Sequence, residues 1–476
     1  MQSVGINQIG TYNTVPTVTK PVGHSVIPPM PPRDKSEITF GNEQLQQPPV
    51  PALNLRTQLT TQEEQTMYMQ LASALDRETA KNLEILLKSG ILLNANSNDG
   101  SSTLINLYKM AATPRAKGLD PRVVLTETIN TLANPFVITQ RFGNIPKAYE
   151  AAILQNAKPN PKAPKDVISP ETINVERSGA CVSASIEFNL AKQMPAEFAR
   201  FAQELTSPKL AVDKVIHLPK LADKTLDAVW LLNAFEVPYK MGDFNTAILR
   251  LAPDANAFVR AQIQTVNKDR GEHSVIDVLM QSTFMNVGSQ QTYDSLTDNR
   301  EGKFNENPKG LIEFEKTFTE SVVQDKNKIS VTYQTVDENG KLVGYEADAE
   351  TVKRHLMDSL VRGENVIIGY TQTDDKGIII NGHEITIIGA REDKKGKLIF
   401  ICNDTDDEKS APVEYSADEL IPMIHHAGLP QEVAEKDMKF VDSWIEGMNA
   451  YKAAKNQPQQ QTPQPLTLPQ PQAKAA

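Results

Sequence analysis

The chain has 476 residues, of which 39% are hydrophobic, and it carries a formal net charge of -10 with a mean hydropathy of -0.38. This length is too great for one ordinary domain and is sufficient for two domains with buried cores. Because no cluster of Lys and Arg with interleaved aromatic residues offsets the acidic balance, we expect neither nucleic acid nor an anionic membrane as a partner.

The first residues and the cysteine content indicate a cellular location. The first thirty residues lack the charged start, apolar core and small-residue cleavage site of a secretory signal, and no later stretch approaches the roughly 18 apolar residues of a membrane span. The two cysteines, Cys181 and Cys402, are too few for a disulfide framework. We therefore expect a cytoplasmic protein with free thiols, while export without an N-terminal signal stays open.

The two ends of the chain differ in composition from the middle. Residues 1–58 contain three Pro-Pro pairs, and the last segment is dominated by Gln, Pro, Ala and Lys. Such segments bury too little apolar surface to offset the entropy lost on ordering them. We predict disordered tails over residues 1–58 and 451–476, with the role of spacers or solubilising segments.

Helical signals follow the first tail. Thr61 stands ahead of Glu64 in the spacing of a capping box, and apolar residues continue at helical intervals through Met67, Leu71 and Leu75. Comparable patterns cover residues 76–90, 101–112 and 120–133. The sequence therefore predicts a small all-helical unit over residues 59–150, followed by a Pro- and Lys-rich linker.

The region 165–450 begins with helical patterns and continues with strand patterns. Helices are predicted over residues 181–191, 195–205, 221–235 and 274–283. Strands are predicted over residues 329–336, 366–370, 378–380, 384–388 and 398–402. Helices followed by strands within one domain favour an α+β fold with a mainly antiparallel sheet.

Cys181 is the candidate nucleophile. It follows Gly179 and Ala180 and directly precedes apolar residues at helical spacing, which places the thiol in the first turn of a helix. There the positive end of the helix dipole favours the thiolate, and the backbone N–H of the cysteine can point toward a developing oxyanion. Taken alone, a cysteine at a helix start is more often a small buried apolar residue.

His383 is the candidate base. It follows Asn381-Gly382, a predicted turn, and opens a strand; the strand 398–402 then ends at Asn403. A hairpin of this kind would bring the Asn403 amide beside the imidazole and fix its tautomer. The alternative is a histidine that only hydrogen-bonds within a turn.

The order and spacing of these residues resemble the papain-like cysteine peptidases. The family's Gly-x-Cys-x-x-x-Ser motif, its histidine followed six residues later by glycine, and its asparagine after an apolar strand are matched by Gly179, Cys181, Ser185, His383, Gly389 and Asn403. The resemblance covers islands between about residues 170 and 405. It implies a papain-like fold, a Cys181-His383-Asn403 triad, peptide or protein substrates, a thioester intermediate and no cofactor.

The sequence also departs from the family pattern. The family's oxyanion glutamine is missing ahead of Cys181, where Asn174 is the possible substitute, and Val182 stands in place of the usual tryptophan. Asp404 competes with Asn403 for the third position, since some relatives use aspartate there. These departures point to a divergent bacterial-type member, and they leave a transglutaminase-like acyl transferase and a non-catalytic papain-fold binding protein as alternatives.

The resemblance gives the helical unit over residues 59–150 two possible roles. It precedes the predicted catalytic domain as inhibitory pro-segments do in many papain-like peptidases, or it is a module that docks a partner. The oligomeric state is left open.

No metal site is predicted. The polar run 94–100 lacks a carboxylate at the first position of a calcium loop, its glycine is one place late, and Ile105 occupies the position of the bidentate glutamate. The acidic residues after Asn403 are expected in a solvated loop. His425 and His426 are expected near the end of a helix that begins at Ala417, without ligands at metal spacing.

Overall fold

The computed structural model describes part of the chain: residues 55–140, 145, 147–158, 160–162, 173, 179–217, 246–266, 274–300, 310–311, 313–337, 340–407 and 409–440. The tails predicted for 1–58 and 451–476 lie outside the described residues, apart from residues 55–58. The helix predicted for 221–235 and the candidate oxyanion residue Asn174 also lie outside them. No helix in the described ranges is both long and apolar enough to cross a membrane.

The first helices form where the sequence predicts them. They are α1 (Gln62–Ala74), α2 (Arg77–Lys88), α3 (Thr103–Ala112) and α4 (Pro121–Ala133). The capping box at the start of α1 is confirmed, because the Thr61 side chain accepts from the Glu64 N–H and the Glu64 side chain accepts in return. Gly90 follows α2 with a φ of +76°, a left-handed conformation that favours glycine at a helix end.

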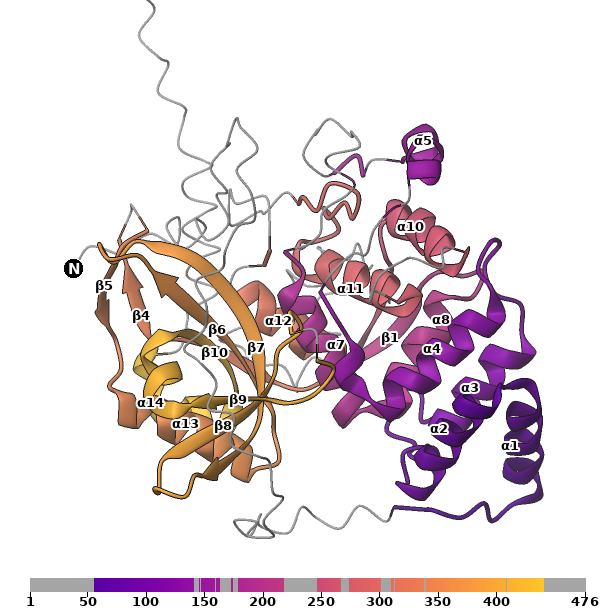
Figure 1. Cartoon of the computed structure of the whole chain (residues 1–476), viewed down its shortest axis with the longest axis horizontal. Coiled ribbons are helices and arrows are strands. Elements are labelled where there is room, and N and C mark those ends of the chain that lie inside the picture. Colours follow the sequence, from indigo (N-terminus) through magenta and orange to yellow (C-terminus); the bar gives the residue numbers. More distant parts are fainter. Residues whose placement is uncertain are drawn as a thin grey trace, which may run out of the picture.

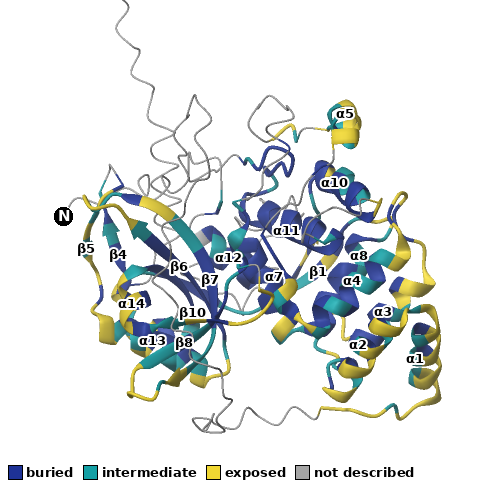
Figure 2. Cartoon of the chain, in the orientation of Figure 1, coloured by how far each residue is buried: buried dark blue, intermediate teal, exposed yellow. Residues whose placement is uncertain are grey.

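A second set of helices packs against the first set. It comprises α5 (Lys147–Asn156), α7 (Cys181–Gln193), α8 (Pro195–Leu205), α10 (Ala255–Val266), α11 (Val275–Gly288) and α12 (Glu313–Gln324). A short antiparallel pair, β1 (Val212–His217) and β2 (Thr246–Leu251), accompanies them. α7 and α11 are buried along almost their whole length, as Figure 2 shows.

One hydrophobic core joins the two sets of helices. Leu107 of α3 and Ile129 of α4 belong to the same cluster as Phe188 of α7 and Phe284 of α11, and all four side chains are fully buried. The expected boundary between a unit over 59–150 and a domain over 165–450 therefore does not coincide with a boundary between cores. The N-terminal helices are built into the same packed layer as the helix that carries Cys181.

The sheet predicted in the second half is mainly antiparallel, as expected. Its six strands run in the order β3-β10-β6-β7-β8-β9, and every neighbouring pair among them is antiparallel. The bounds are β3 (Lys328–Thr332), β6 (Val366–Thr373), β7 (Ile379–Glu392), β8 (Leu398–Asn403), β9 (Val413–Ser416) and β10 (Ile424–Pro430). The mixed α+β class is thus confirmed.

Smaller elements surround the sheet. They are β4 (Gln334–Val336), β5 (Leu342–Tyr345), α13 (Ala349–Val361), α14 (Ala417–Leu420), α15 (Gln431–Ala434) and the 3-10 turns η2 (Pro135–Val137), η4 (Ile421–Met423) and η5 (Glu435–Phe440). α13, α14 and α15 share a second core with the sheet, which contains Leu356, Ile385 and Phe400. Figure 1 shows the sheet on one side of the molecule, the N-terminal helices on the other, and α7 and α12 between them.

Two local predictions in this region are wrong. Asn381 and Gly382 do not form a turn, because they lie inside β7 and pair with Gln372 and Thr371 of β6. His425 and His426 do not end a helix, since α14 stops at Leu420 and both histidines lie in β10 between β3 and β6. In both places, pairing with strands distant in sequence decides the conformation over local pattern.

Candidate active site

Cys181 is the first residue of α7. Its N-cap residue, Ala180, contributes no side-chain cap, so the first N–H groups of the helix have no acceptor from that side chain. A residue from a distant segment fixes the turn ahead of the cysteine, because the Gly179 N–H donates to Oδ2 of Asp298 across 2.7 Å. The thiol is half-buried at the positive end of the helix, the position that the sequence predicts for it.

His383 lies in β7 with its imidazole between two partners. Nε2 is 2.7 Å from Oδ1 of Asp404, and the side chain of Cys181 lies close enough to the ring to help raise the pKa of the imidazole. Since Nε2 is taken by the carboxylate, Nδ1 is the nitrogen left for the sulfur. The ring of Tyr370, directly opposite on β6, meets the imidazole edge-on at 5.7 Å between centroids. The structure therefore brings the predicted nucleophile and the predicted base together.

Asp404 is held in place by three donors. Besides His383, the hydroxyl of Tyr415 donates to Oδ2 at 2.9 Å, and the N–H of Asp406 donates to Oδ1 at 3.0 Å. Burial by itself would raise the pKa of Asp404, but the charge and hydrogen bond of His383, with help from the other two donors, lower the pKa to about 2. The carboxylate is therefore ionised across the physiological range.

The ionised Asp404 determines the charge of His383. Burial would lower the pKa of His383, but the charge and hydrogen bond of Asp404, together with the hydrogen bond from Cys181, raise that pKa well above its ordinary value. The imidazole that faces the start of α7 is therefore protonated near neutral pH.

Asp404, the alternative candidate for the third position, contacts His383, whereas Asn403 does not. Asn403 was expected to orient His383, but it lies directly opposite Thr386 in the β7/β8 pair, so its side chain shares the face of Thr386 and Glu384. His383 is the direct neighbour of Glu384 on β7, and successive side chains of a strand point to opposite faces, so His383 points to the other face. Asn403 Nδ2 is buried and has no hydrogen-bond partner in the described part of the chain. Asp404, the alternative third residue, is one position further and reaches the face of His383.

Cys402 is not placed for attack. Its thiol is fully buried in the sheet core opposite Ile387, and burial, followed by the charge of Asp404, raises its pKa. The candidate oxyanion residue Asn174 lies outside the described residues. The first backbone N–H groups of a helix have no intrahelical acceptor, which makes those of α7 candidate oxyanion donors.

A buried ion pair beside the site was not predicted from the sequence. Lys316 of α12 bonds Oε1 of Glu384, the neighbour of His383 on β7. Burial would lower the pKa of Lys316, but the charges of Glu384 and Glu313, and of Cys181 after them, raise it. The lysine is therefore a second cation that acts on the sulfur. A signal was present in the sequence, because a glutamate within a strand of apolar residues needs a buried partner.

Gly369 makes room for this ion pair. It lies opposite Glu384 in the β6/β7 pair, and a Cβ at this position would come within 2.5 Å of Glu384 Oε1. A side chain on β6 would therefore displace the carboxylate that holds Lys316.

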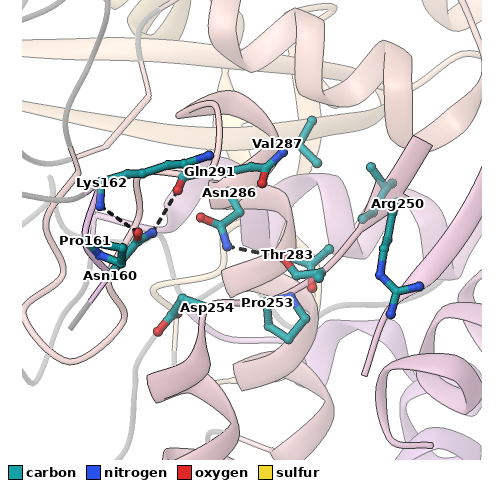
Figure 3. Close-up of a pocket in the computed structure, with 12 residues that line it drawn as sticks. Asn160, Pro161, Lys162, Arg250, Pro253, Asp254, Thr283, Asn286, Val287 and Gln291 are labelled. Atoms are coloured by element: carbon teal, nitrogen blue, oxygen red, sulfur yellow. Dashed lines mark hydrogen bonds between the residues drawn. The ribbon is translucent and has the colours of Figure 1, made fainter. Parts of the chain in front are cut away.

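One cavity of the described structure lies elsewhere. Figure 3 shows it between the loop at Asn160, β2 and α11, with a volume of about 230 Å³. Its polar lining side chains are largely engaged with one another or with backbone, as in the bond of 2.8 Å from Asn160 to the Gln291 carbonyl. None of Cys181, His383 and Asp404 lines it, so it is separate from the candidate site.

The described residues contain no group of three or more His, Cys, Asp or Glu side chains arranged to hold a metal ion. In comparisons with known proteins, no family model, no curated protein and no solved structure matches the chain.

Proposed function

We propose that the chain is a cysteine-dependent hydrolase, a peptidase or amidase of the papain-like superfamily, that acts on peptide or protein substrates through a thioester on Cys181. The observation that carries this proposal is the contact of one imidazole, that of His383, with both the Cys181 side chain and the Asp404 carboxylate, at 2.7 Å from the latter. A buried carboxylate that holds a histidine against a nucleophile is the recurring arrangement of covalent acyl transfer.

The chemistry of acylation follows from the three roles. The Cys181 thiolate attacks the carbonyl carbon of the scissile amide, and the electron pair of the C=O bond moves to oxygen. The N–H groups at the start of α7 are suited to stabilise this oxyanion. As the C=O bond re-forms, His383 gives its proton to the leaving nitrogen, the C–N bond breaks and an amine departs.

Deacylation reverses the role of the histidine. His383 takes a proton from water while the water oxygen attacks the thioester carbonyl. The C–S bond then breaks, a carboxylic acid leaves, and the pair of thiolate and imidazolium is restored. Asp404 stays ionised throughout and stabilises the imidazolium. This cycle uses no cofactor, and it suits a reducing compartment such as the cytoplasm, where Cys181 stays a thiol.

The test is a thiol-directed alkylating probe, with the labelled residue located by mass spectrometry. The intact chain should be labelled at Cys181 at pH 6, where an ordinary thiol of pKa about 8.5 reacts slowly. Cys181→Ala should abolish the label, Cys402→Ser should leave it unchanged, and His383→Gln should slow it. A label on Cys402, or a Cys181 that reacts only like an ordinary thiol, would refute the proposal and leave a binding role as the better interpretation.

Acyl transfer is separated from hydrolysis by the products. With a peptide or amide substrate, hydrolysis releases a free acid whether or not a primary amine is added. A transglutaminase-like activity would convert the added amine into a new amide. We expect the acid to dominate in both conditions.

A further inference from the structure

A short segment after the N-terminal helices contacts the turn that carries Asp404. The Thr405 carbonyl accepts from the Gln140 N–H at 3.2 Å and from Oγ1 of Thr139 at 3.1 Å. In return, Oγ1 of Thr405 donates to Oε1 of Gln140 at 3.3 Å. All three residues are buried. The residue next to Asp404 is thus held by three hydrogen bonds from residues about 265 positions away in the sequence.

The same segment is bonded to the helix of the nucleophile. The Gln281 Nε2 donates to the Thr139 carbonyl and to Oε2 of Glu187, each at 2.9 Å. Glu187 lies on α7 less than two turns after Cys181. A continuous hydrogen-bonded path therefore joins the helix that carries Cys181 to the turn that carries Asp404, and Thr139 and Gln140 lie in its middle.

The segment is also fixed on the side of α4. Phe136 of η2 packs on Phe188 of α7 with ring centroids 5.1 Å apart, and Asn134 Nδ2 donates to the Ser410 carbonyl at 3.4 Å. Residues 134–140 thus lie between α7 and the chain that follows β8. The aromatic contact helps to fix the position of this segment, and with it the position of the polar groups that bond Thr405.

We propose that Thr139 and Gln140 are positioning residues of the active site, which hold Thr405 so that Asp404 stays against His383. This inference rests on the proposed function. Asp404 is outside β8, and its turn is closed locally by the bond of 3.1 Å from the Asp407 N–H to the Asp404 carbonyl. The local bond shapes the turn, whereas Thr139 and Gln140 fix where it sits relative to α7.

The proposal gives the N-terminal helices a role opposite to that of an inhibitory pro-segment. An inhibitory segment lowers reactivity while it is present. If the segment that follows α4 and η2 holds the Asp404 turn through Thr139 and Gln140, it raises reactivity while it is present, since misplacement of a triad residue by about 1 Å can cost a large part of the rate.

The experiment compares Thr139→Val, Thr405→Val and their double variant with Thr128→Val in the full chain. Each substitution removes one hydroxyl from a buried threonine at nearly constant shape. Thr128 is the matched control. Its hydroxyl donates to the Val124 carbonyl within α4 and to Sδ of Met110, both away from the site. Thr139→Ser keeps the hydroxyl and serves as the rescue variant.

Two readouts are used, and neither requires a known substrate: the His383 titration by NMR and the pH profile of Cys181 alkylation. Thr139→Val and Thr405→Val should each lower the His383 pKa and slow alkylation at pH 6 about three- to tenfold, which is the worth of one buried hydrogen bond. Thr128→Val and Thr139→Ser should match the wild type. A folded double variant with an unchanged His383 titration and alkylation profile overturns the positioning role alone. A wild type without an elevated His383 pKa and without a reactive Cys181 overturns the proposed function as well.

Discussion

The imidazole Nε2 of His383 lies 2.7 Å from Oδ1 of Asp404, although one residue comes from β7 and the other follows the end of β8. The contact joins β7 to the turn that follows β8, while the other side of the ring faces the helix that begins at Cys181. The geometry of the candidate site therefore depends on how the sheet and the start of α7 are held together.

The third position of the triad gives the first prediction. Asp404→Asn should lower turnover by roughly 10²- to 10⁴-fold, because the amide cannot stabilise the imidazolium and allows the wrong tautomer. Asn403→Ala should keep activity within about threefold and cost about 1 kcal/mol of stability as a buried polar residue. The measurement is kcat/KM on a peptide or amide substrate, beside urea unfolding. A larger loss for Asn403→Ala than for Asp404→Asn would return the third role to Asn403.

The ion pair of Lys316 and Glu384 gives the second prediction. Lys316→Met removes a cation that acts on Cys181, so the alkylation profile should move to higher pH. The double variant Lys316→Met/Glu384→Gln is the control, because it avoids an unpaired buried carboxylate yet still lacks the cation. The double variant should be more stable than Lys316→Met, and its alkylation profile should move to higher pH by the same amount. An unshifted midpoint in the double variant would assign the pair a structural role only.

The buried carboxyls of Glu187 and Asp277 give a prediction on pH and stability. Burial raises the pKa of Asp277 to about 6, and burial and then the charge of Asp277 raise the pKa of Glu187 well above its usual value. Both carboxyls therefore hold protons in the folded state at pH values where they lose them in the unfolded state. Their contribution to stability is complete below about pH 4 and declines as the pH rises through the folded pKa values.

The variant Glu187→Gln tests the predicted direction of this pH dependence of stability. The variant should gain stability relative to the wild type as the pH rises from 4 to 8, by about 1.4 kcal/mol for each unit of the removed pKa shift. The measurement is the free energy of unfolding in urea at several pH values. A difference between Glu187→Gln and wild type that does not vary with pH would contradict the buried, protonated pair.

Deletion of the N-terminal helices gives the last prediction. A chain without residues 1–140 loses Leu107, Met110, Val124 and Ile129 from the core shared with α7 and α11. We expect it to lose cooperative thermal unfolding, since removal of one large buried side chain alone costs about 2–5 kcal/mol. A truncated chain that folds and shows faster alkylation of Cys181 would instead support the inhibitory pro-segment.

Much of the local structure could be predicted from the sequence because it depends on neighbours in the chain. The Thr61 and Glu64 capping box sets the start of α1. Apolar spacing after Cys181 predicts that the thiol opens a helix, and the alternation of side chains after His383 predicts strands. The residue types at Cys181 and His383 then suffice to propose them as nucleophile and base.

Tertiary structure decided which groups act with these two residues. Strand register sends the Asn403 side chain to one face and Asp404 to the other, and a slip of one residue would exchange them. Lys316 and the segment of Thr139 and Gln140 reach the site only because α12 and the N-terminal helices pack against α7. Local pattern determines which residues form a helix or a strand, but contacts between segments far apart in sequence depend on packing, and no local pattern carries that information.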